Sequence, residues 1–367
     1  MIFNKTGKLL KRNFKYKNAN IETVREYKYL GFLLVPSGSV MAGLNDLKCR
    51  GNRAMFKIKN QMGEYFRLRP QVSIKLFNSL VKPILLYMAD LWGCVKMPKT
   101  DPIVTVQMKF LKQLLGVQTQ TTNIGVLLET GELPLSVYAK KQCIKNLVRI
   151  MRNKANKIIQ TSVENAINDK LTWFEKIKKE LFSVGLGDYL MAVKTTTDHV
   201  EQIYFQRKSD IFHQDAFGII NENDSKLRTY SQFKTEIGFE KYLIEVTSLQ
   251  ERTALTKFRL SNHKLMIEKG RHVRPKKLEI RERICPFCPE HVEDELHFLL
   301  ICRNFDAHRE GLLMHANNVL AGFEFLNNKE KLAKLITDPK TIRETAKYLY
   351  KSFEVREFIL NRHKNIL

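Results

Sequence analysis

The sequence predicts a mainly α-helical protein with a small β-hairpin at its N-terminus. Apolar residues make up 44% of the 367 residues, which is enough to form ordinary hydrophobic cores. From residue 40 onward apolar residues recur at helical spacing, whereas residues 21–35 are rich in β-branched, aromatic and aliphatic residues and are followed by the turn sequence PSGS. A β segment this short is not stable alone, so the class is mainly α with a minor β start.

The predicted elements follow one another in a simple order. KTGKLLKRN is typical of a hairpin turn around Gly7, and strands over 21–35 follow it. Apolar residues at helical spacing then predict helices over 40–62, 70–93 with a kink at Pro83, 103–116 with Gly116 as C-cap, 136–153, 170–185, 231–246, 251–261, 305–320 and 340–360.

The predicted elements group into five segments along the chain. They are a β-hairpin over 1–39, a helical region over 40–160, a helical connector over 161–250, a cysteine-rich and basic segment over 251–310, and C-terminal helices over 311–367. The stretch 190–228 is polar and mixed in composition, and we expect it to be a mobile connection.

A cluster of cysteines near the C-terminus has the spacing of metal ligands. CPFCPEHVEDELHFLLIC (285–302) holds Cys285, Cys288, His297 and Cys302 in the pattern C-x2-C-x8-H-x4-C. Two residues between Cys285 and Cys288 form a tight turn, and a short helix over LHFLLIC brings the other two together. Three thiolates and an imidazole suit tetrahedral Zn²⁺, and because all four ligands are protein groups the zinc is expected to be structural.

Two other interpretations of this cluster remain open. The cysteines and His297 are buried turn and core residues in one of them, and His291 replaces His297 as the fourth ligand in the other. The acidic run Glu293–Glu295 is expected to consist of solvated carboxylates or partners of nearby arginines. Cys49, Cys94 and Cys143 are scattered, which suits free thiols in a reducing compartment.

The charge of the chain predicts a polyanionic partner. The formal net charge is +24, and residues 1–80 hold 16 Lys or Arg against 4 Asp or Glu. Nucleic acid, RNA or DNA, bound through its phosphates, is the expected partner; an anionic membrane surface or plain solubility are the alternatives. The candidate phosphate-binding residues lie in the helix 40–62 and in KGRHVRPKK (269–277): Lys48, Arg50, Arg53, Lys57, Lys59, Lys269, Arg271, Arg274, Lys276 and Lys277.

Other functional classes find less support in the sequence. The longest apolar run, ILLYMA, is far shorter than the ~18 residues that span a bilayer, and the N-terminus has no secretory signal pattern. We therefore expect an intracellular protein, in nucleus or cytoplasm, without a membrane partner or a small-molecule substrate. YMAD (87–90) is similar to a polymerase motif, but Asp90 has no adjacent aspartate with which to hold two metal ions.

Several segments together resemble reverse transcriptases of non-LTR retrotransposons. REYKYLGFLL (25–34) resembles the Y-L-G hairpin that follows their catalytic palm. CPFCPEHVEDELHFLLIC resembles the cysteine–histidine module near the C-termini of these polyproteins. Four segments resemble the long helical region between the two: LFNSLVKPILLYMADLWG, KFLKQLLGVQTQTTNIGVLLETGELPL, SKLRTYSQFKTEIGFEKYL and LSNHKLMIEKGRHVRPK.

The resemblance implies the roles of these parts. Tyr29, Leu30 and Gly31 would form a primer-grip-like hairpin, the following helices a thumb-like bundle that tracks a duplex, and the zinc module a holder of nucleic acid. The family's polymerase carboxylates lie upstream of the hairpin, and the 28 residues before Tyr29 contain no aspartate. We therefore expect a non-catalytic nucleic-acid-binding protein, a truncated or co-opted fragment. The alternatives are a zinc-stabilised protein-interaction module or a piece of a longer active polymerase.

Overall fold

The computed structural model describes residues 1–4, 6–10, 12–98, 100–152, 157–168, 172–188, 199–222 and 225–364. Helices account for 63% and strands for 4% of the structure, which confirms the mainly α class. None of the described helices combines the length and apolar character needed to cross a membrane.

The β structure consists of two short antiparallel hairpins. Strands β1 (Phe14–Tyr16) and β2 (Ala19–Ile21) form one, and β3 (Tyr27–Tyr29) and β4 (Phe32–Leu34) form the other. The second lies within the predicted strand region. Gly7 does form a turn, with its amide donating to the Asn4 carbonyl at 3.2 Å, but the nearest strands are those of the first hairpin, which was not predicted.

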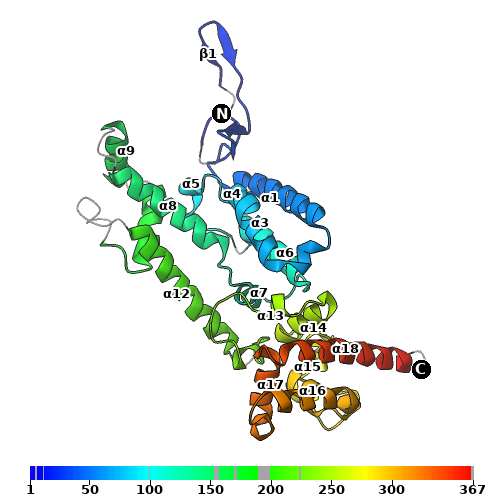
Figure 1. The fold of residues 1–367 in the computed structure, drawn as a ribbon. Coiled ribbons are helices and arrows are strands. Elements are labelled where there is room, and N and C mark those ends of the chain that lie inside the picture. Colours follow the sequence, from blue (N-terminus) through cyan, green and yellow to red (C-terminus); the bar gives the residue numbers. More distant parts are fainter. Residues whose placement is uncertain are drawn as a thin grey trace. The chain divides into compact units, whose positions relative to one another are not determined.

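The helices follow the hairpins to the end of the described chain (Figure 1). They are α1 (Met41–Met62), α2 (Tyr65–Leu68), α3 (Pro70–Leu76), α4 (Lys82–Leu85), α5 (Ala89–Trp92), α6 (Pro102–Leu115), α7 (Asn123–Thr130), α8 (Leu135–Arg152), α9 (Lys157–Asn168), α10 (Thr172–Phe182), α12 (Val200–Ile220), α13 (Tyr242–Glu245), α14 (Leu249–Arg259), α15 (Met266–Lys269), α16 (Asp306–Val319), α17 (Asn328–Thr337) and α18 (Ile342–Lys364).

The chain forms two compact units, each assembled from three stretches of sequence. The first comprises Met1–Gly63, Ile74–Met108 and Leu133–Phe212, and the second Glu64–Ser73, Lys109–Glu132 and His213–Leu367. The predicted segments 40–160 and 161–250 each contribute to both units.

The first unit packs the second hairpin and α1 on the segments around α4, and α5 on α8. Phe32 of β4 fits against Gly43 of α1, where a Cβ atom would lie 2.2 Å from the phenyl ring. A separate apolar core joins α8, α10 and α12 through buried side chains that include Ile144, Ile177 and Tyr204.

The second unit is built around α18. Helices α14, α16 and α17 all pack against α18, as Figure 1 shows for the yellow-to-red part of the chain. Its core holds a buried cluster of charges: the Arg259 guanidinium binds Glu129 at 2.9 Å and Glu240 at 2.8 Å and lies over the rings of Phe233 and Tyr242.

Two helix predictions differ from the structure in an informative way. The predicted helix 70–93 is interrupted by a π-helical turn (Phe77–Val81), in which the Lys82 amide bonds the Phe77 carbonyl. It ends at Leu85, and Met88, whose φ is 55°, directly precedes the separate short helix α5. The turn directly precedes Pro83, which lacks an amide donor for the helix. The irregular turn thus ends two residues before the position at which a kink was predicted.

The predicted helix 231–246 was wrong except at its end. Only a 3₁₀ turn (Tyr230–Gln232) and α13 are helical there. The backbone between them instead bonds the C-terminal end of α7. Phe239 forms a β-bridge with Thr130, and the Glu240 amide donates to the Glu129 carbonyl at 3.0 Å. Within 190–228, α12 is a long helix that was not predicted, and residues 190–198 and 223–224 lie outside the described part.

Candidate metal centre and charged surfaces

The cysteine cluster forms a compact group of metal donors in the second unit. One donor atom from each of Cys285, Cys288, His297 and Cys302 lies within 4.8 Å of all the others. The Cys302 sulfur is 3.9 Å from that of Cys285 and 3.8 Å from that of Cys288. A disulfide needs about 2.0 Å, whereas a tetrahedral ion with Zn–S bonds of about 2.3 Å separates its sulfurs by about 3.8 Å. The spacing fits a metal ion and not a disulfide.

A tight turn places the first two sulfurs. The Cys288 amide donates to the Cys285 carbonyl at 3.3 Å, and the Cys285 amide donates to the His291 carbonyl at 2.8 Å. An antiparallel bridge between Ile284 and Val292 closes the base of this loop. The two residues between Cys285 and Cys288 therefore form the turn that the sequence predicted.

A π-helical turn places the other two ligands. Residues His297–Ile301 form it, and the Cys302 amide donates to the His297 carbonyl at 2.8 Å. In an α-helix, two residues five apart point about 140° away from each other. The wider π turn reduces this angle and brings the His297 ring and the Cys302 sulfur to one side. The Asp294 carboxylate caps the turn by accepting from the His297 amide at 2.7 Å.

The imidazole of His297 is prepared for a further ligand. Both of its ring nitrogens are buried, and neither has a hydrogen-bond partner among the described residues. Buried polar atoms are ordinarily satisfied, and an ion bound beside the three sulfurs would satisfy one of these nitrogens. His291, the alternative ligand, stacks on the His297 ring at 5.2 Å and is not in the donor group.

The thiols are electrostatically coupled. A hydrogen bond with Cys302 lowers the pKa of the Cys285 thiol to about 4, against the opposing effect of burial. The same hydrogen bond, together with burial, raises the pKa of Cys302. The lowered pKa favours the thiolate form of Cys285, which is the form that binds metal. Together these features give a group that can hold a metal ion.

The acidic run beside the centre is buried and ion-paired. The Glu293 carboxylate is 1% exposed and binds the Arg356 guanidinium through two contacts of 2.7 Å. Glu295 is 0% exposed and accepts from Arg228 at 2.7 Å and from His263 at 3.0 Å. Of the two alternatives expected for the acidic run, the structure shows arginine partners for Glu293 and Glu295. These arginines come from distant parts of the chain.

Burial alone would raise the pKa of Glu295. The hydrogen bond with His263 and the charges of His263 and Arg228 outweigh that effect and hold its pKa well below the usual range. Glu295 also accepts hydrogen bonds from Thr229 at 2.9 Å and Ser261 at 3.0 Å. The carboxylate is therefore ionised and almost saturated with donors, which is the condition under which a buried charge is tolerated.

The basic loop after α15 is largely exposed. Lys269, Arg274, Lys276 and Lys277 are exposed, and among the described residues none of the four has a carboxylate within 4.0 Å. Arg271 differs, because its guanidinium lies 3.4 Å from Glu268 and donates to the Ser225 carbonyl at 3.5 Å. Four of the five candidate cations in this loop are thus accessible to a phosphate.

The candidate phosphate-binding residues on α1 also divide into accessible cations and one that is engaged in internal contacts. Arg53, Lys57 and Lys59 are exposed and Lys48 is half-buried. Arg50 instead holds the protein together, since it donates to the Gly31 carbonyl at 2.8 Å and pairs with Asp46 at 2.7 Å. Exposed cations on a helix face can contact a phosphate backbone, and Arg50 is already committed to an internal contact.

The tip of the second hairpin is a two-residue turn. Leu30 and Gly31 both have positive φ, 46° and 83°, which matches the right-handed twist of the strands and favours glycine at the second position. The Tyr87 hydroxyl donates to the Leu30 carbonyl, and Arg50 holds the next carbonyl. The side chains of Tyr29 and Leu30 remain 55% and 68% exposed, so the tip is fixed by its backbone and leaves these two side chains free.

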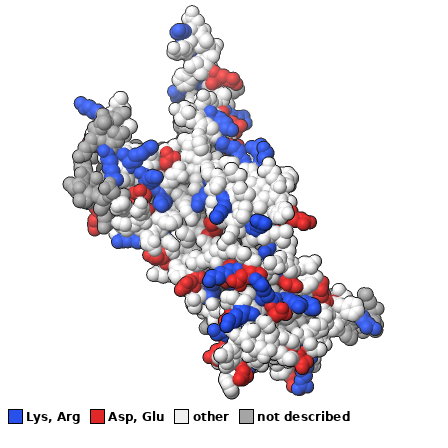
Figure 2. All heavy atoms as spheres, in the orientation of Figure 1, with Lys and Arg blue, Asp and Glu red and all other residues white. Residues whose placement is uncertain are grey.

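Sequence reasoning missed a further basic row on α8. Lys141, Lys145, Arg149 and Arg152 are spaced by four, four and three residues and therefore lie along one side of the helix. Lys145, Arg149 and Arg152 are exposed, and Figure 2 shows Lys and Arg gathered near α8 and α9. The spacing is readable in SVYAKKQCIKNLVRIMRN, and counting charges by helical period would have found it.

Asp90, of the polymerase-like YMAD, lies in the short helix α5 and is half-buried. Its carbonyl accepts from the Trp173 indole at 3.4 Å, so the residue has a place in the packing of the first unit.

No protein-family model, curated protein or solved structure matches the chain.

Proposed function

We propose that this chain binds nucleic acid through phosphate contacts and that Cys285, Cys288, His297 and Cys302 hold a structural zinc ion. The donor set of three sulfurs and one imidazole favours zinc over the hard cations. Four protein donors fill a tetrahedral shell and leave no position for a reactive water, which favours a structural role over a catalytic one.

The observation that carries the proposal is the unneutralised basic loop next to this centre. Lys269, Arg274, Lys276 and Lys277 are exposed and lack carboxylate partners among the described residues, in a chain of net charge +24. The loop is held in place at its end: the Leu278 amide bonds the Gly270 carbonyl at 3.0 Å. Unpaired cations on a supported loop are suited to phosphate oxygens.

We propose further that the chain derives from the post-palm part of a non-LTR retrotransposon reverse transcriptase. The support is the order of the resembling segments, from the Y-L-G hairpin to the cysteine–histidine module. Among the described residues no carboxylates form a group that could hold a metal ion, and the chain alone is therefore expected to extend no primer. A primer-extension assay with the purified chain tests this point, and incorporation above background would contradict it.

Binding itself is tested by fluorescence anisotropy with labelled oligonucleotides at 50 and 200 mM salt. We expect binding at 50 mM that weakens steeply at 200 mM, because each phosphate contact releases counterions. The variant Lys276→Gln/Lys277→Gln should lower affinity and flatten the salt dependence. The control, Lys329→Gln/Lys334→Gln, removes the same charge from exposed positions on α17 and should bind like the wild type.

Two outcomes would contradict the proposal. One is a failure of the wild type to bind RNA or DNA, single-stranded or duplex, at 50 mM salt. The other is an equal loss of affinity in both double variants, because a loss that depends only on net charge would mean that the basic loop is no specific contact. Protein partners that survive nuclease treatment would favour the protein-interaction function instead.

A further inference from the structure

Two adjoining cavities form one groove in the second unit. Their volumes are about 470 and 550 Å³, within the range of small-ligand sites. The loop after α6, helix α14, the segment 261–272 and helix α18 provide the walls. The two cavities share six of their lining residues, so one ligand can occupy both. The shared residues are Gln118, Asn262, His263, Lys264, Arg356 and Glu357.

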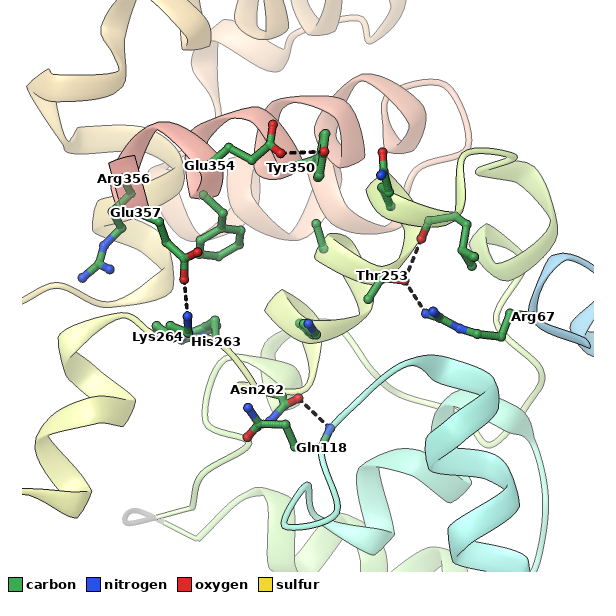
Figure 3. A pocket seen from close by; sticks show the side chains of 15 residues that line it. Arg67, Gln118, Thr253, Asn262, His263, Lys264, Tyr350, Glu354, Arg356 and Glu357 are labelled. Carbon is green, nitrogen blue, oxygen red and sulfur yellow. Dashed lines mark hydrogen bonds and ion pairs between the residues drawn. The ribbon is translucent and has the colours of Figure 1, made fainter. Parts of the chain in front are cut away.

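The first cavity is lined by amides and aromatic rings (Figure 3). The Gln118 backbone amide donates to the Asn262 side-chain oxygen at 3.1 Å, and the Asn262 side-chain amide donates to the Gln118 side-chain oxygen at 3.4 Å, which places the two side-chain amides beside each other. The His263 ring stacks on Phe353 at 6.2 Å with 24° between the planes. Amides pair with the edges of nucleobases, and aromatic rings stack on their faces.

Cations without carboxylate partners occur along the groove. Among the described residues no carboxylate lies within 4.0 Å of Arg67 or Lys257 in the first cavity or of Lys226 in the second. Burial lowers the pKa of both Arg67 and Lys226, and for Lys226 it outweighs the opposing effect of the Glu268 charge. The Arg67 Nε atom is buried and has no hydrogen-bond partner among the described residues. A half-buried cation that lacks an anion gains most when an anionic ligand arrives.

The acidic run of the metal loop positions the walls of this groove. Glu295 holds His263, and Glu293 holds Arg356 and the Met266 amide, the latter at 2.6 Å. Pro286, between the first two cysteines, lines the second cavity itself. The loop that carries the metal donors therefore both lines the groove and holds its wall residues in place.

From these contacts we propose that the groove binds a single strand of RNA or DNA, with a base in the amide-lined cavity and phosphates on Lys226 and Lys257. This rests on the proposed nucleic-acid function and names its site. A duplex keeps its bases stacked and their Watson–Crick edges paired, so no base can enter the amide-lined cavity, whereas a single strand exposes both the faces and these edges of its bases.

One ion pair lies where a strand would pass. Lys264 and Glu357 each line both cavities and bind each other, and both side chains are well exposed. The Glu357 carboxylate is also a repulsive charge for a phosphate. Replacing it by glutamine should free Lys264 and remove that repulsion, so the variant should bind a single strand more tightly than the wild type.

The test compares variants of the full zinc-loaded chain by anisotropy with a labelled 12-nucleotide strand, as RNA and as DNA, and with the duplex. Lys226→Gln/Lys257→Gln should weaken single-strand binding at 50 mM salt and flatten its salt dependence, since each lost phosphate contact reduces the slope of log affinity against log salt by about 0.7. Glu357→Gln should strengthen it. The matched control, Lys329→Gln/Lys334→Gln, should not change it, and circular dichroism checks that each variant is folded.

The possible outcomes distinguish a failure of the groove proposal from a failure of the proposed nucleic-acid binding. If the wild type binds but the groove variants bind like the control, or if the duplex binds as tightly as the single strand, the groove proposal is overturned while nucleic-acid binding stands. If the wild type binds no nucleic acid at all, both proposals fail. A preference between the RNA and DNA arms identifies which strand the groove accepts.

Discussion

The pair between Glu293 and Arg356 allows the sharpest prediction about the structure, because it joins the metal loop to α18. We predict that Glu293→Gln strongly destabilises the second unit. The two side chains are 1% and 4% exposed and share two contacts of 2.7 Å. Glu293 also accepts from the Met266 amide, so the carboxylate connects three elements.

The magnitude follows from what the substitution leaves behind. Glutamine keeps the shape and one acceptor but leaves the Arg356 guanidinium buried without a counter-charge. Removing one partner of a buried ion pair costs about 3–5 kcal/mol. Because glutamine still accepts one hydrogen bond, we expect the lower end, about 3 kcal/mol, which is more than a 100-fold change in the unfolding equilibrium.

The assay is urea unfolding followed by far-ultraviolet circular dichroism, with zinc present throughout. Glu290→Gln is the matched control, because Glu290 is exposed in the same loop, and exposed substitutions of this kind change stability by about 0.5 kcal/mol or less. The reasoning is refuted if Glu293→Gln unfolds within 0.5 kcal/mol of the control, since Arg356 would then not depend on its buried partner.

Three further predictions test the centre and the packing. Cys302→Ser should reduce the zinc content, measured by atomic absorption, from about one ion per chain to almost none, whereas exposed Cys49 can be replaced without loss. Folding lowers the pKa of Glu295, so its contribution to stability is present above about pH 4.5 and is lost as the pH falls further. In urea unfolding, Glu295→Gln should therefore lose less free energy of unfolding below pH 4.5 than the wild type. Equal losses in the two proteins would contradict this prediction. In thermal unfolding, Gly43→Ala should destabilise the chain because the added Cβ meets Phe32. Gly311→Ala should stabilise the chain by about 0.5–1 kcal/mol, because Gly311 lies within α16 and its Cβ would enter open space. A Gly43→Ala variant that is more stable than Gly311→Ala would contradict the packing.

Local patterns in the sequence predicted much of the fold and the four residues of the candidate metal centre. The cysteine and histidine spacing identified the four donors, because ligands within 18 residues are constrained by short loops. The apolar period predicted α1, α6, α8, α14, α16 and α18 within a few residues of their bounds. These are features that neighbouring residues determine.

Features that depend on distant residues could not be predicted. Glu293 meets Arg356 from 63 positions away, and Glu129 meets Arg259 from 130 positions away. No local pattern distinguishes such a buried carboxylate from a solvated one. The predicted helix over 231–246 failed for the same reason, because its backbone pairs with Thr130 and its Glu240 with Arg259. The groove combines residues from six separate stretches of the chain, at 67, 118–120, 226, 249–272, 286 and 350–361, and is visible only after folding.

The most direct test of the account is ultraviolet cross-linking of a bound single strand to the zinc-loaded chain, with the linked peptides mapped by mass spectrometry. We predict cross-links in peptides that cover Phe353, His263 and the loop at Gln118, reduced by competing unlabelled strand. An absence of cross-links anywhere on the chain, under conditions where a known binding protein is linked, would contradict the claim that this protein holds nucleic acid.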